Sequence, residues 1–337
     1  MLKVALIGYG YWGPNLARNW NLNRRAKLEY VCDLLDDRLS LAKLNYPYIK
    51  TTKDYMDILN DPDIEAVNIV TPIATHYEIA KKALEHNKHI LVEKPFTASS
   101  EQMLELMEIA KKNRRIMMVG HTFLYSPPVI KLQEYIKNGT LGSIDFIQLT
   151  RINLGRVKHD HNVIWDLAPH DFSILEFWLN DMPETIQVVG KASTFKNICD
   201  IAFISLKYPG DILVNIHLSW LSPVKLRQSY IVGKQKMVVY DDAHPTEKIK
   251  LYDMGIDVIK NPETFGEFQL TYRSGDIYAP RLDNSEPLSA ECNHFIDCIK
   301  TNSIPRTNSE HALRIIKMIE AAQESLKENG KLIRLKK

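Results

Sequence analysis

The sequence has few of the features that mark secreted, membrane or nucleic-acid-binding proteins. Its 337 residues include only four cysteines, none in a Cys-x-x-Cys pair, and a chain of this size needs no disulfide scaffold. No apolar run approaches the roughly 20 residues of a membrane helix. The formal net charge of +2 leaves no basic field for nucleic acid or an anionic membrane. We therefore expect a cytoplasmic protein whose partner is a small molecule, with no nucleic acid and no membrane among its partners.

The first third of the chain alternates short apolar runs with helical patterns, which is typical of parallel βαβ units. The runs lie at residues 4–7, 28–32, 66–70, 89–92 and 116–119, with a weaker one at 48–50. Between the last two runs, Ser99 precedes a helical pattern and Gln102 follows three residues later, which predicts a capped helix start. This part is predicted to be a doubly wound α/β domain.

The remainder changes to longer β-rich segments at hairpin spacing. These segments lie at residues 144–151, 185–191, 201–208, 212–220, 230–233 and 236–240. One strong helix is expected to begin near Asp166 with Pro169 in its first turn, and two more helices are expected at 286–300 and 310–328. We predict an α/β domain over 1–121, an α+β domain with a large, mostly antiparallel, open-faced sheet over 122–306, and a C-terminal helix over 307–337 that packs back on the first domain.

A glycine motif follows the first expected strand directly. Gly8, Gly10 and Gly13 fit G-x-G-x-x-G between that strand and a helix starting near residue 14, which is the context of a Rossmann dinucleotide fingerprint. The first glycine permits a tight turn, the second lets backbone approach a pyrophosphate, and the third lets helix and strand pack closely. Tyr11 and Trp12, between the glycines, are therefore also expected at the cofactor. A glycine-rich turn that only shortens a loop is the alternative.

An acid at the end of the second strand indicates which dinucleotide binds. Asp33 lies about 20 residues past the fingerprint, where a carboxylate bonds the ribose 2′-hydroxyl of NAD. Arg38 follows closely enough to reach a 2′-phosphate instead. The sequence favours NAD and does not exclude NADP.

Three further motifs follow in order: Thr71-Pro72 with His76, then Glu93-Lys94-Pro95, then a segment from Asp166 to His170. Together with the fingerprint they resemble the glucose–fructose oxidoreductase, inositol dehydrogenase and MocA (Gfo/Idh/MocA) family over nearly the whole chain. The resemblance implies that Thr71, Pro72, His76 and Glu93 line the cofactor and that Lys94 stands beside the nicotinamide. It also implies that Asp166 and His170 face the substrate carbon from the second domain. For His76, a simple strand-to-helix turn is an equal alternative.

The residue chemistry agrees with these roles. Asp166 and His170 are four residues apart, so on a helix they share one face. Histidine is poised near neutral pH to take an alcohol proton, so His170 is predicted to be the base, Asp166 its partner, and Lys94 the group that bonds the reacting oxygen. Lys94 as the proton acceptor is an alternative, as is a metal site formed by His159, His161, Asp166 and His170; we expect no metal.

The resemblance is strongest to family members that oxidise C3 of nucleotide-activated amino sugars, such as UDP-N-acetylglucosamine, for surface polysaccharides. Tyr125, Arg151 and Arg156 are predicted to contact substrate, the arginines through phosphates. The alternative for the two arginines is that they are ordinary solvated surface residues. The enzyme alternatives are an inositol or free-sugar dehydrogenase and a 3-ketosugar reductase, and a different class is an NAD(H)-sensing regulator without turnover. An uncovered sheet face would expose apolar surface, which predicts a homodimer or homotetramer.

Overall fold

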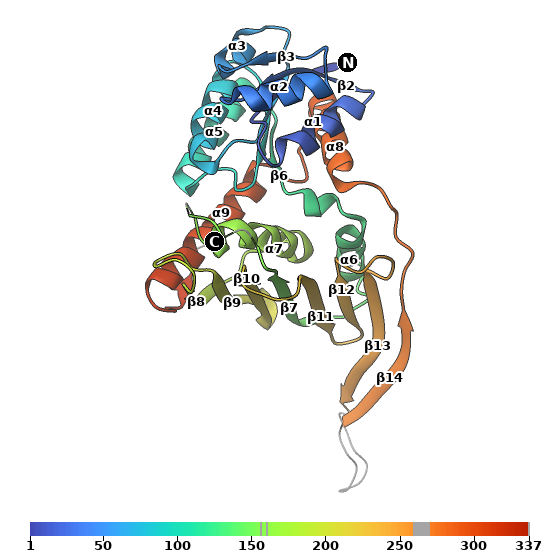
Figure 1. The fold of residues 1–337 in the computed structure, drawn as a ribbon. Coiled ribbons are helices and arrows are strands. Elements are labelled where there is room, and N and C mark those ends of the chain that lie inside the picture. The colour runs from blue at the N-terminus through green and yellow to red at the C-terminus, as the bar shows by residue number, and fades with distance from the viewer. Residues whose placement is uncertain (156, 160, 259–269, 336–337) are drawn as a thin grey trace, which may run out of the picture. The chain divides into compact units, whose positions relative to one another are not determined.

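The computed structural model describes residues 1–155, 157–159, 161–258 and 270–335. The chain forms two units, each described by itself (Figure 1): residues 1–126 with 285–317, and residues 127–284 with 318–337. The sequence-based division instead ended the first domain at 121 and left the helix near 290 in the second. That helix belongs to the first unit because its Phe295 packs edge-on against Trp20, with 6.4 Å between ring centroids.

The first unit is built on a six-stranded parallel sheet in the order β3-β2-β1-β4-β5-β6. Its strands are β1 (Leu2–Ile7), β2 (Ala26–Cys32), β3 (Lys50–Thr52), β4 (Ala66–Ile69), β5 (His89–Glu93) and β6 (Met117–Gly120). Three of them, β1, β4 and β6, are buried along almost their whole length, and β5 is buried at its three central residues, as expected for a sheet covered on both faces. The predicted doubly wound domain is confirmed, and its order reverses between β1 and β4.

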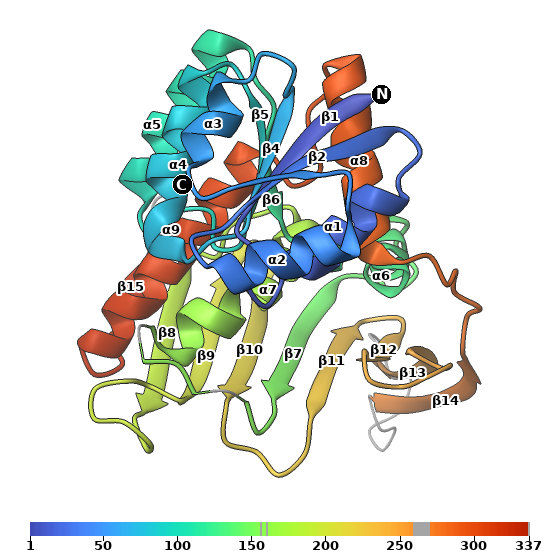
Figure 2. The ribbon, with the colours of Figure 1, turned by 45° about the horizontal axis from the view of Figure 1, so that its top comes forward.

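Helices cover both faces of this sheet (Figure 2). They are α1 (Gly13–Leu22), α2 (Asp36–Asn45), α3 (Tyr55–Asn60), α4 (Ile73–Glu85), α5 (Ser100–Asn113), the short η1 (Thr122–Tyr125), α8 (Pro287–Thr301) and the first half of α9 (Ser309–Lys327). The pair α4 and α5 lies against one face, and α1 and α8 lie against the other. The predicted cap is present, since the Ser99 side chain accepts a hydrogen bond from Gln102 N.

The second unit contains a nine-stranded mixed sheet in the order β14-β13-β12-β11-β7-β10-β9-β8-β15. Its strands are β7 (Ile144–Ile152), β8 (Thr185–Lys191), β9 (Ile201–Tyr208), β10 (Ile212–Ser219), β11 (Leu226–Gly233), β12 (Met237–Asp241), β13 (Ile249–Val258), β14 (Leu270–Tyr278) and β15 (Ile333–Arg334). Among the described strands of this sheet, only β7 and β10 pair in parallel. The expected, mostly antiparallel sheet is confirmed. The sequence did not predict β13 and β14, and the described part of β14 is exposed on both faces, so it lacks the alternation of a half-buried strand.

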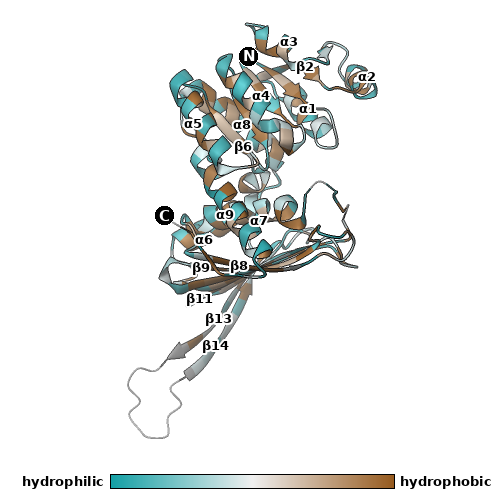
Figure 3. Ribbon diagram, turned by 90° about the vertical axis from the view of Figure 1, so that its left-hand side faces the viewer, coloured by the Kyte–Doolittle hydropathy of each residue, from teal (hydrophilic) through white to brown (hydrophobic). Residues whose placement is uncertain are grey.

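Two helices of the second unit, α6 (Pro127–Lys137) and α7 (Val163–Leu179), lie on one face of this sheet (Figure 3). The start predicted for α7 was wrong. Asn162 caps the helix by accepting hydrogen bonds from Ile164 N and Trp165 N, so Asp166 lies one turn inside it. Pro169 therefore sits within the helix, where it removes one backbone hydrogen bond.

The other face of the nine-stranded sheet carries no helix among the described residues (Figure 3). Side chains alternate along its strands, so that buried residues face α6 and α7 while the opposite set is open. On the open face Phe203 stacks on His217 across β9 and β10, with 4.5 Å between ring centroids. Leu213 is also exposed there, opposite Phe146 of β7. The predicted open-faced sheet is therefore present.

Candidate functional site

The glycine fingerprint lies where the ends of β1 and β4 meet. A Cβ on Gly8 would stand 2.6 Å from Val70 O, and one on Gly13 would stand 2.6 Å from Gly8 O. These two glycines are therefore required by packing. At Gly10 a Cβ would meet nothing nearer than the Arg38 guanidinium, at 3.6 Å. The loop is thus open on the Gly10 side, where the pyrophosphate of a dinucleotide would approach backbone.

Helix α1 starts at the last glycine of this loop. Its N-cap residue, Trp12, makes no side-chain capping hydrogen bond, and no acidic residue lies in the first turn. Its first N–H groups therefore have no side-chain acceptor at the cap and face no carboxylate in the turn, which suits a phosphate. Tyr11 is 84% exposed beside them. The loop and the helix start together fit the pyrophosphate of a dinucleotide.

Asp33 follows the end of β2, beside this loop. Its carboxylate accepts hydrogen bonds from Tyr9 N at 2.7 Å and Leu35 N at 3.0 Å. These two backbone donors fix the position of the carboxylate. Arg38 Nη1 also approaches it, at 3.2 Å, so Arg38 is paired with the acid that would bind a ribose. The structure thus brings both predicted determinants of dinucleotide choice together.

The turn after β4 holds Thr71 and Pro72, and His76 lies one turn into α4. The His76 ring is buried between two backbone oxygens, with Nδ1 2.9 Å from Pro95 O and Nε2 2.7 Å from Thr71 O. Burial lowers the pKa of His76, and a neutral ring has one N–H to donate. His76 therefore joins the turn after β4 to the turn after β5, and its ring does not face outward.

Lys94 follows β5, and the bond from Lys94 to Pro95 is cis. The side chain of Glu93, the last residue of β5, turns toward the neighbouring strand β6. A Cβ on Gly120 would stand 2.9 Å from Glu93 Oε1, and Lys94 N donates to Glu93 Oε2 at 3.3 Å. Burial raises the pKa of Glu93 to about 7, against the lowering effects of Lys94 and of a hydrogen bond from the Trp12 side chain.

Sequence reasoning missed the buried polar groups behind this turn. His121 and His311 lie with Nδ1 and Nε2 only 2.8 Å apart, both buried. Thr122 donates to Glu291 Oε2 at 2.9 Å, from η1 to α8. No local motif marks these pairs, because their partners are 169 to 190 residues apart in the chain.

The second unit supplies the predicted acid and base. Asp166 and His170 lie on α7, and both side chains are partly exposed. The Trp220 indole, itself buried, donates to Asp166 Oδ2 at 3.1 Å. His161 Nε2 lies 4.0 Å from Asp166 Oδ1. Trp220 follows β10 and was not predicted to have a role, although it holds the carboxylate that is one helical turn from His170.

The three residues predicted to contact substrate are placed differently. Arg151 is buried and forms two hydrogen bonds to Asp171, at 2.8 and 2.9 Å. Tyr125 is buried in the first unit, with its hydroxyl 3.2 Å from Thr307 Oγ1. Arg156 lies outside the described residues. Both described side chains are thus engaged inside the protein.

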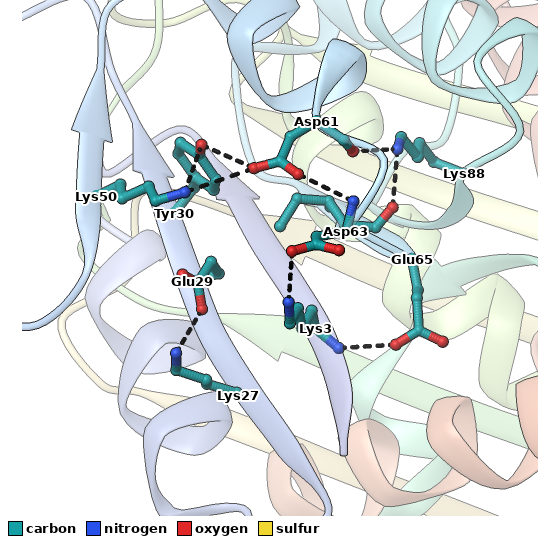
Figure 4. Close-up of polar contacts among 10 residues, drawn as sticks. Lys3, Lys27, Glu29, Tyr30, Lys50, Asp61, Asp63, Glu65 and Lys88 are labelled. Atoms are coloured by element: carbon teal, nitrogen blue, oxygen red, sulfur yellow. Dashed lines mark hydrogen bonds and ion pairs between the residues drawn. The ribbon is translucent and has the colours of Figure 1, made fainter.

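A separate group of charged residues lies at the opposite, amino-terminal edge of the parallel sheet (Figure 4). Lys3 Nζ pairs with Asp63 at 2.7 Å, and Tyr30 donates to Asp61 at 2.9 Å. Lys88 Nζ donates to Asp61 O at 2.7 Å. These contacts join strands and turns. The Lys3–Asp63 pair is exposed, and exposed ion pairs contribute little to stability.

Two features are absent from the described part of the chain: a cluster of metal ligands and a membrane-spanning helix. No group of three or more His, Cys, Asp or Glu side chains is arranged to hold a metal ion there. The ring of His159, one of the alternative metal ligands, packs against Phe195 with 4.5 Å between centroids. No described helix is long and apolar enough to cross a membrane.

The fold and the cofactor edge define an oxidoreductase with an NAD-binding Rossmann domain, and comparison with known proteins agrees. A model described as oxidoreductase family, NAD-binding Rossmann fold, matches residues 2–121. A second, described as oxidoreductase family, C-terminal alpha/beta domain, matches residues 133–333. The chain belongs to the Gfo/Idh/MocA oxidoreductase family and binds NAD.

Several relatives match almost the whole chain. The uncharacterized oxidoreductase YrbE of Bacillus subtilis is 24% identical over 336 residues, 96% of this chain and 94% of the relative. Myo-inositol 2-dehydrogenase of Thermotoga maritima is 22% identical over 97% of each chain. The solved structure of UDP-N-acetylglucosamine 3-dehydrogenase GnnA from Acidithiobacillus ferrooxidans has the same fold, with a TM-score of 0.81 at 20% identity over 97% of this chain and 98% of that one.

Proposed function

We propose that this oxidoreductase oxidises a sugar hydroxyl to a ketone with NAD, at C3 of a nucleotide-activated amino sugar such as UDP-N-acetylglucosamine. The observation that carries the proposal is the pair of Asp166 and His170 on α7, with Asp166 held by the buried Trp220. The likeness to a UDP-N-acetylglucosamine 3-dehydrogenase supports the substrate class. In this proposal the enzyme works in the cytoplasm, in the synthesis of surface polysaccharides.

The proposed chemistry assigns one task to each residue. NAD⁺, when bound, accepts the hydride that leaves the substrate carbon. His170 takes the hydroxyl proton, and Asp166 stabilises the imidazolium that results. Lys94 bonds the reacting oxygen and stabilises its developing negative charge. Lys94 as the proton acceptor is the alternative assignment.

Cofactor contacts are proposed on the same basis. Gly8, Gly10 and Gly13, with Tyr11 and Trp12, shape the pyrophosphate loop, and Asp33 binds the adenosine ribose. Thr71 and Pro72 line the nicotinamide half, and His76 and Glu93 support that turn through the contacts described above.

Two of the predicted substrate contacts are revised in this proposal. Arg151 and Tyr125 support the fold, because their polar atoms already have protein partners. Arg156 remains the proposed phosphate contact.

Substrate choice is tested by following NADH formation with UDP-N-acetylglucosamine, myo-inositol and glucose. The highest kcat/KM is expected with the nucleotide sugar. A higher value with myo-inositol or glucose would favour a free-sugar or inositol dehydrogenase, and turnover only from 3-ketosugar with NADH would favour a reductase. Tight NADH binding without turnover of any substrate would favour a redox sensor.

The assigned roles are tested by His170→Ala, which is expected to abolish turnover and leave NAD affinity unchanged, because His170 lies outside the Rossmann unit. Isothermal titration with NAD⁺ measures the affinity. A loss of NAD affinity would show that His170 contributes to cofactor binding and that its assignment to the substrate hydroxyl is wrong.

We also propose that the open sheet face binds a second copy of this chain. Phe203 and Leu213 are exposed apolar residues on this face. In a symmetric dimer the same face of each subunit packs against the other, which would bury these apolar side chains. Light scattering of the wild type should give a dimer or tetramer, and Leu213→Asp should lower the mass. A monomeric wild type would refute the proposal.

A further inference from the structure

A buried ion pair lies directly beside His170 in the second unit. Arg151 of β7 donates to both carboxylate oxygens of Asp171 on α7, through Nε at 2.9 Å and Nη2 at 2.8 Å. The exposed fractions of the two side chains are 8% and 4%. Asp171 is the residue after His170, so a contact with two bonds and a fixed geometry holds the helix one residue from the candidate base.

Arg151 occupies an otherwise apolar part of the sheet. It follows Ile147 and Leu149 on the buried face of β7, and the residue opposite it on β10 is the buried Leu218. An arginine there loses its hydration, and the attraction of a carboxylate often does no more than offset that loss. Apolar side chains of similar volume often stabilise such a position equally well or better. Stability alone therefore does not account for the ion pair.

The backbone of α7 is interrupted at the same place. Pro169 has no N–H, so Trp165 O, four residues earlier, receives no hydrogen bond from it. The Ser173 hydroxyl donates to His170 O at 2.8 Å, and a serine contact of this kind tends to bend a helix. The backbone hydrogen bonds of α7 thus fix the direction of His170 less firmly than those of an uninterrupted helix would. Contacts from outside the helix have to supply the rest.

Two contacts from the sheet hold α7 on either side of His170. The Trp220 indole holds Asp166, four residues before His170, and Arg151 holds Asp171, one residue after it. Arg151 is the last residue but one of β7, and Trp220 directly follows β10, which runs parallel to β7 as its neighbour. Both donors therefore lie at the same edge of the sheet. A helix held at two points along its length cannot rotate about its axis without breaking one of the contacts.

We propose that the Arg151–Asp171 ion pair positions His170 by fixing the rotation of α7, so that the imidazole keeps its direction. Arg151 and Asp171 are then positioning residues, which act through His170 and do not touch substrate. The role of His170 as the base rests on the proposed function, whereas the effect of the ion pair on the position of the imidazole does not.

Arg151→Met and Asp171→Leu, made together, separate positioning from stability. Both charges are replaced by apolar side chains, so the melting temperature should stay close to that of the wild type. With the best substrate of the NADH assay, kcat should fall by about 10- to 100-fold at nearly unchanged KM, because a misplacement of about 1 Å can cost roughly 100-fold in rate. A wild-type kcat in the folded double variant would overturn the proposal. A raised KM with unchanged kcat would also overturn it, since Arg151 would then be a substrate contact.

The control is a second ion pair of the same sheet. Arg273 Nε lies 3.3 Å from Asp253 Oδ1, and this pair joins β14 to β13. Arg273→Met with Asp253→Leu removes the same two charges from the second unit and changes no residue of α7. This double variant should keep the wild-type kcat. An equal fall in kcat in both double variants would indicate a general effect on the sheet and count against the proposal.

A further variant covers the case in which the double variant of Arg151 and Asp171 does not fold. Arg151→Lys keeps a positive charge beside Asp171, but an ammonium group lacks the planar fork that donates two parallel bonds. This variant should fold and still lower kcat. A wild-type kcat would show that the two-bond geometry has no part in the reaction, and the proposal would be wrong.

NMR of isotope-labelled histidine provides a readout apart from turnover. The ring signal of His170, assigned by its loss in His170→Ala, should shift or broaden in Arg151→Lys, which keeps both charges, and stay in place in the control variant. An unchanged signal in Arg151→Lys would refute the positioning role. If the wild type turns over no substrate, the proposed function fails, while a shifted His170 signal still supports the role of the ion pair.

Discussion

Trp220→Phe is the most direct test of how the candidate base is supported. The indole N–H of Trp220 donates to Asp166 Oδ2 at 3.1 Å, and the ring is buried after β10. Phenylalanine keeps most of the apolar ring and removes the donor. Asp166 would then lose the group that holds its carboxylate one turn from His170 on α7.

The size of the effect follows from the charge on the acceptor. A hydrogen bond to an ionised group contributes about 1.5–3 kcal/mol. If Asp166 orients His170 in the transition state, loss of this bond lowers kcat by about 10- to 150-fold, because about 1.4 kcal/mol corresponds to a factor of ten. NAD affinity should not change, since Trp220 lies outside the Rossmann unit.

Trp178→Phe is the matched control. Trp178 is also buried in the second unit, and its indole N–H donates to Val129 O at 3.0 Å, a neutral backbone acceptor. Both variants remove one N–H and the five-membered ring that carries it, so both should lower the melting temperature. Only Trp220→Phe should lower kcat by the amount given above. Equal kcat values for the two variants would refute the reasoning that Trp220 acts through Asp166.

Other predictions concern the Rossmann unit. Gly10→Ala should fold normally, because its methyl group meets only the Arg38 side chain, and it should weaken NAD⁺ binding in calorimetry, because that methyl group lies where the pyrophosphate would approach the backbone. Gly13→Ala should lower the melting temperature, because its methyl group would clash with Gly8 O. Asp33→Ala should weaken NAD⁺ binding and leave Arg38 free for a 2′-phosphate, so the ratio of NADP⁺ to NAD⁺ affinity should rise. The folded-state pKa of Glu93 is about 7, raised from 4.5, so its contribution to the free energy of unfolding falls as pH rises from about 4.5 to 7. Denaturant titrations across this pH range should show a smaller fall in the free energy of unfolding for Glu93→Gln than for the wild type.

Much of the fold was predictable because it depends on local patterns. The parallel strands are short apolar runs between helical segments, and six of them form the sheet that the pattern predicts. The hairpin spacing of the second unit was also readable, and Gly210 adopts φ +77° in the turn between β9 and β10. The start of α7 was not, because Asn162 caps the helix four residues before Asp166, where the sequence placed its start.

The candidate site also contains both residues that the sequence could predict and residues that it could not. The residues predicted from motifs, including Gly10, Asp33 and Lys94, lie at strand ends, where chain direction alone decides the position of a side chain. Arg151 could not be assigned in this way, because its sequence context gives no sign of Asp171 at 20 residues' distance. A basic residue on a strand is equally consistent with a phosphate contact and a buried ion pair.

The residues that the motifs miss share one physical property. Trp220, Glu291 and His311 act on motif residues or their neighbours through side-chain contacts that join segments 54 to 190 residues apart. A motif records the groups that chemistry requires at fixed spacing, whereas the groups that set their charge and orientation can come from any element that packs nearby. Substitutions at such supporting positions should therefore alter pH dependence and kcat before they alter NAD binding, and this order of effects distinguishes them from the fingerprint residues.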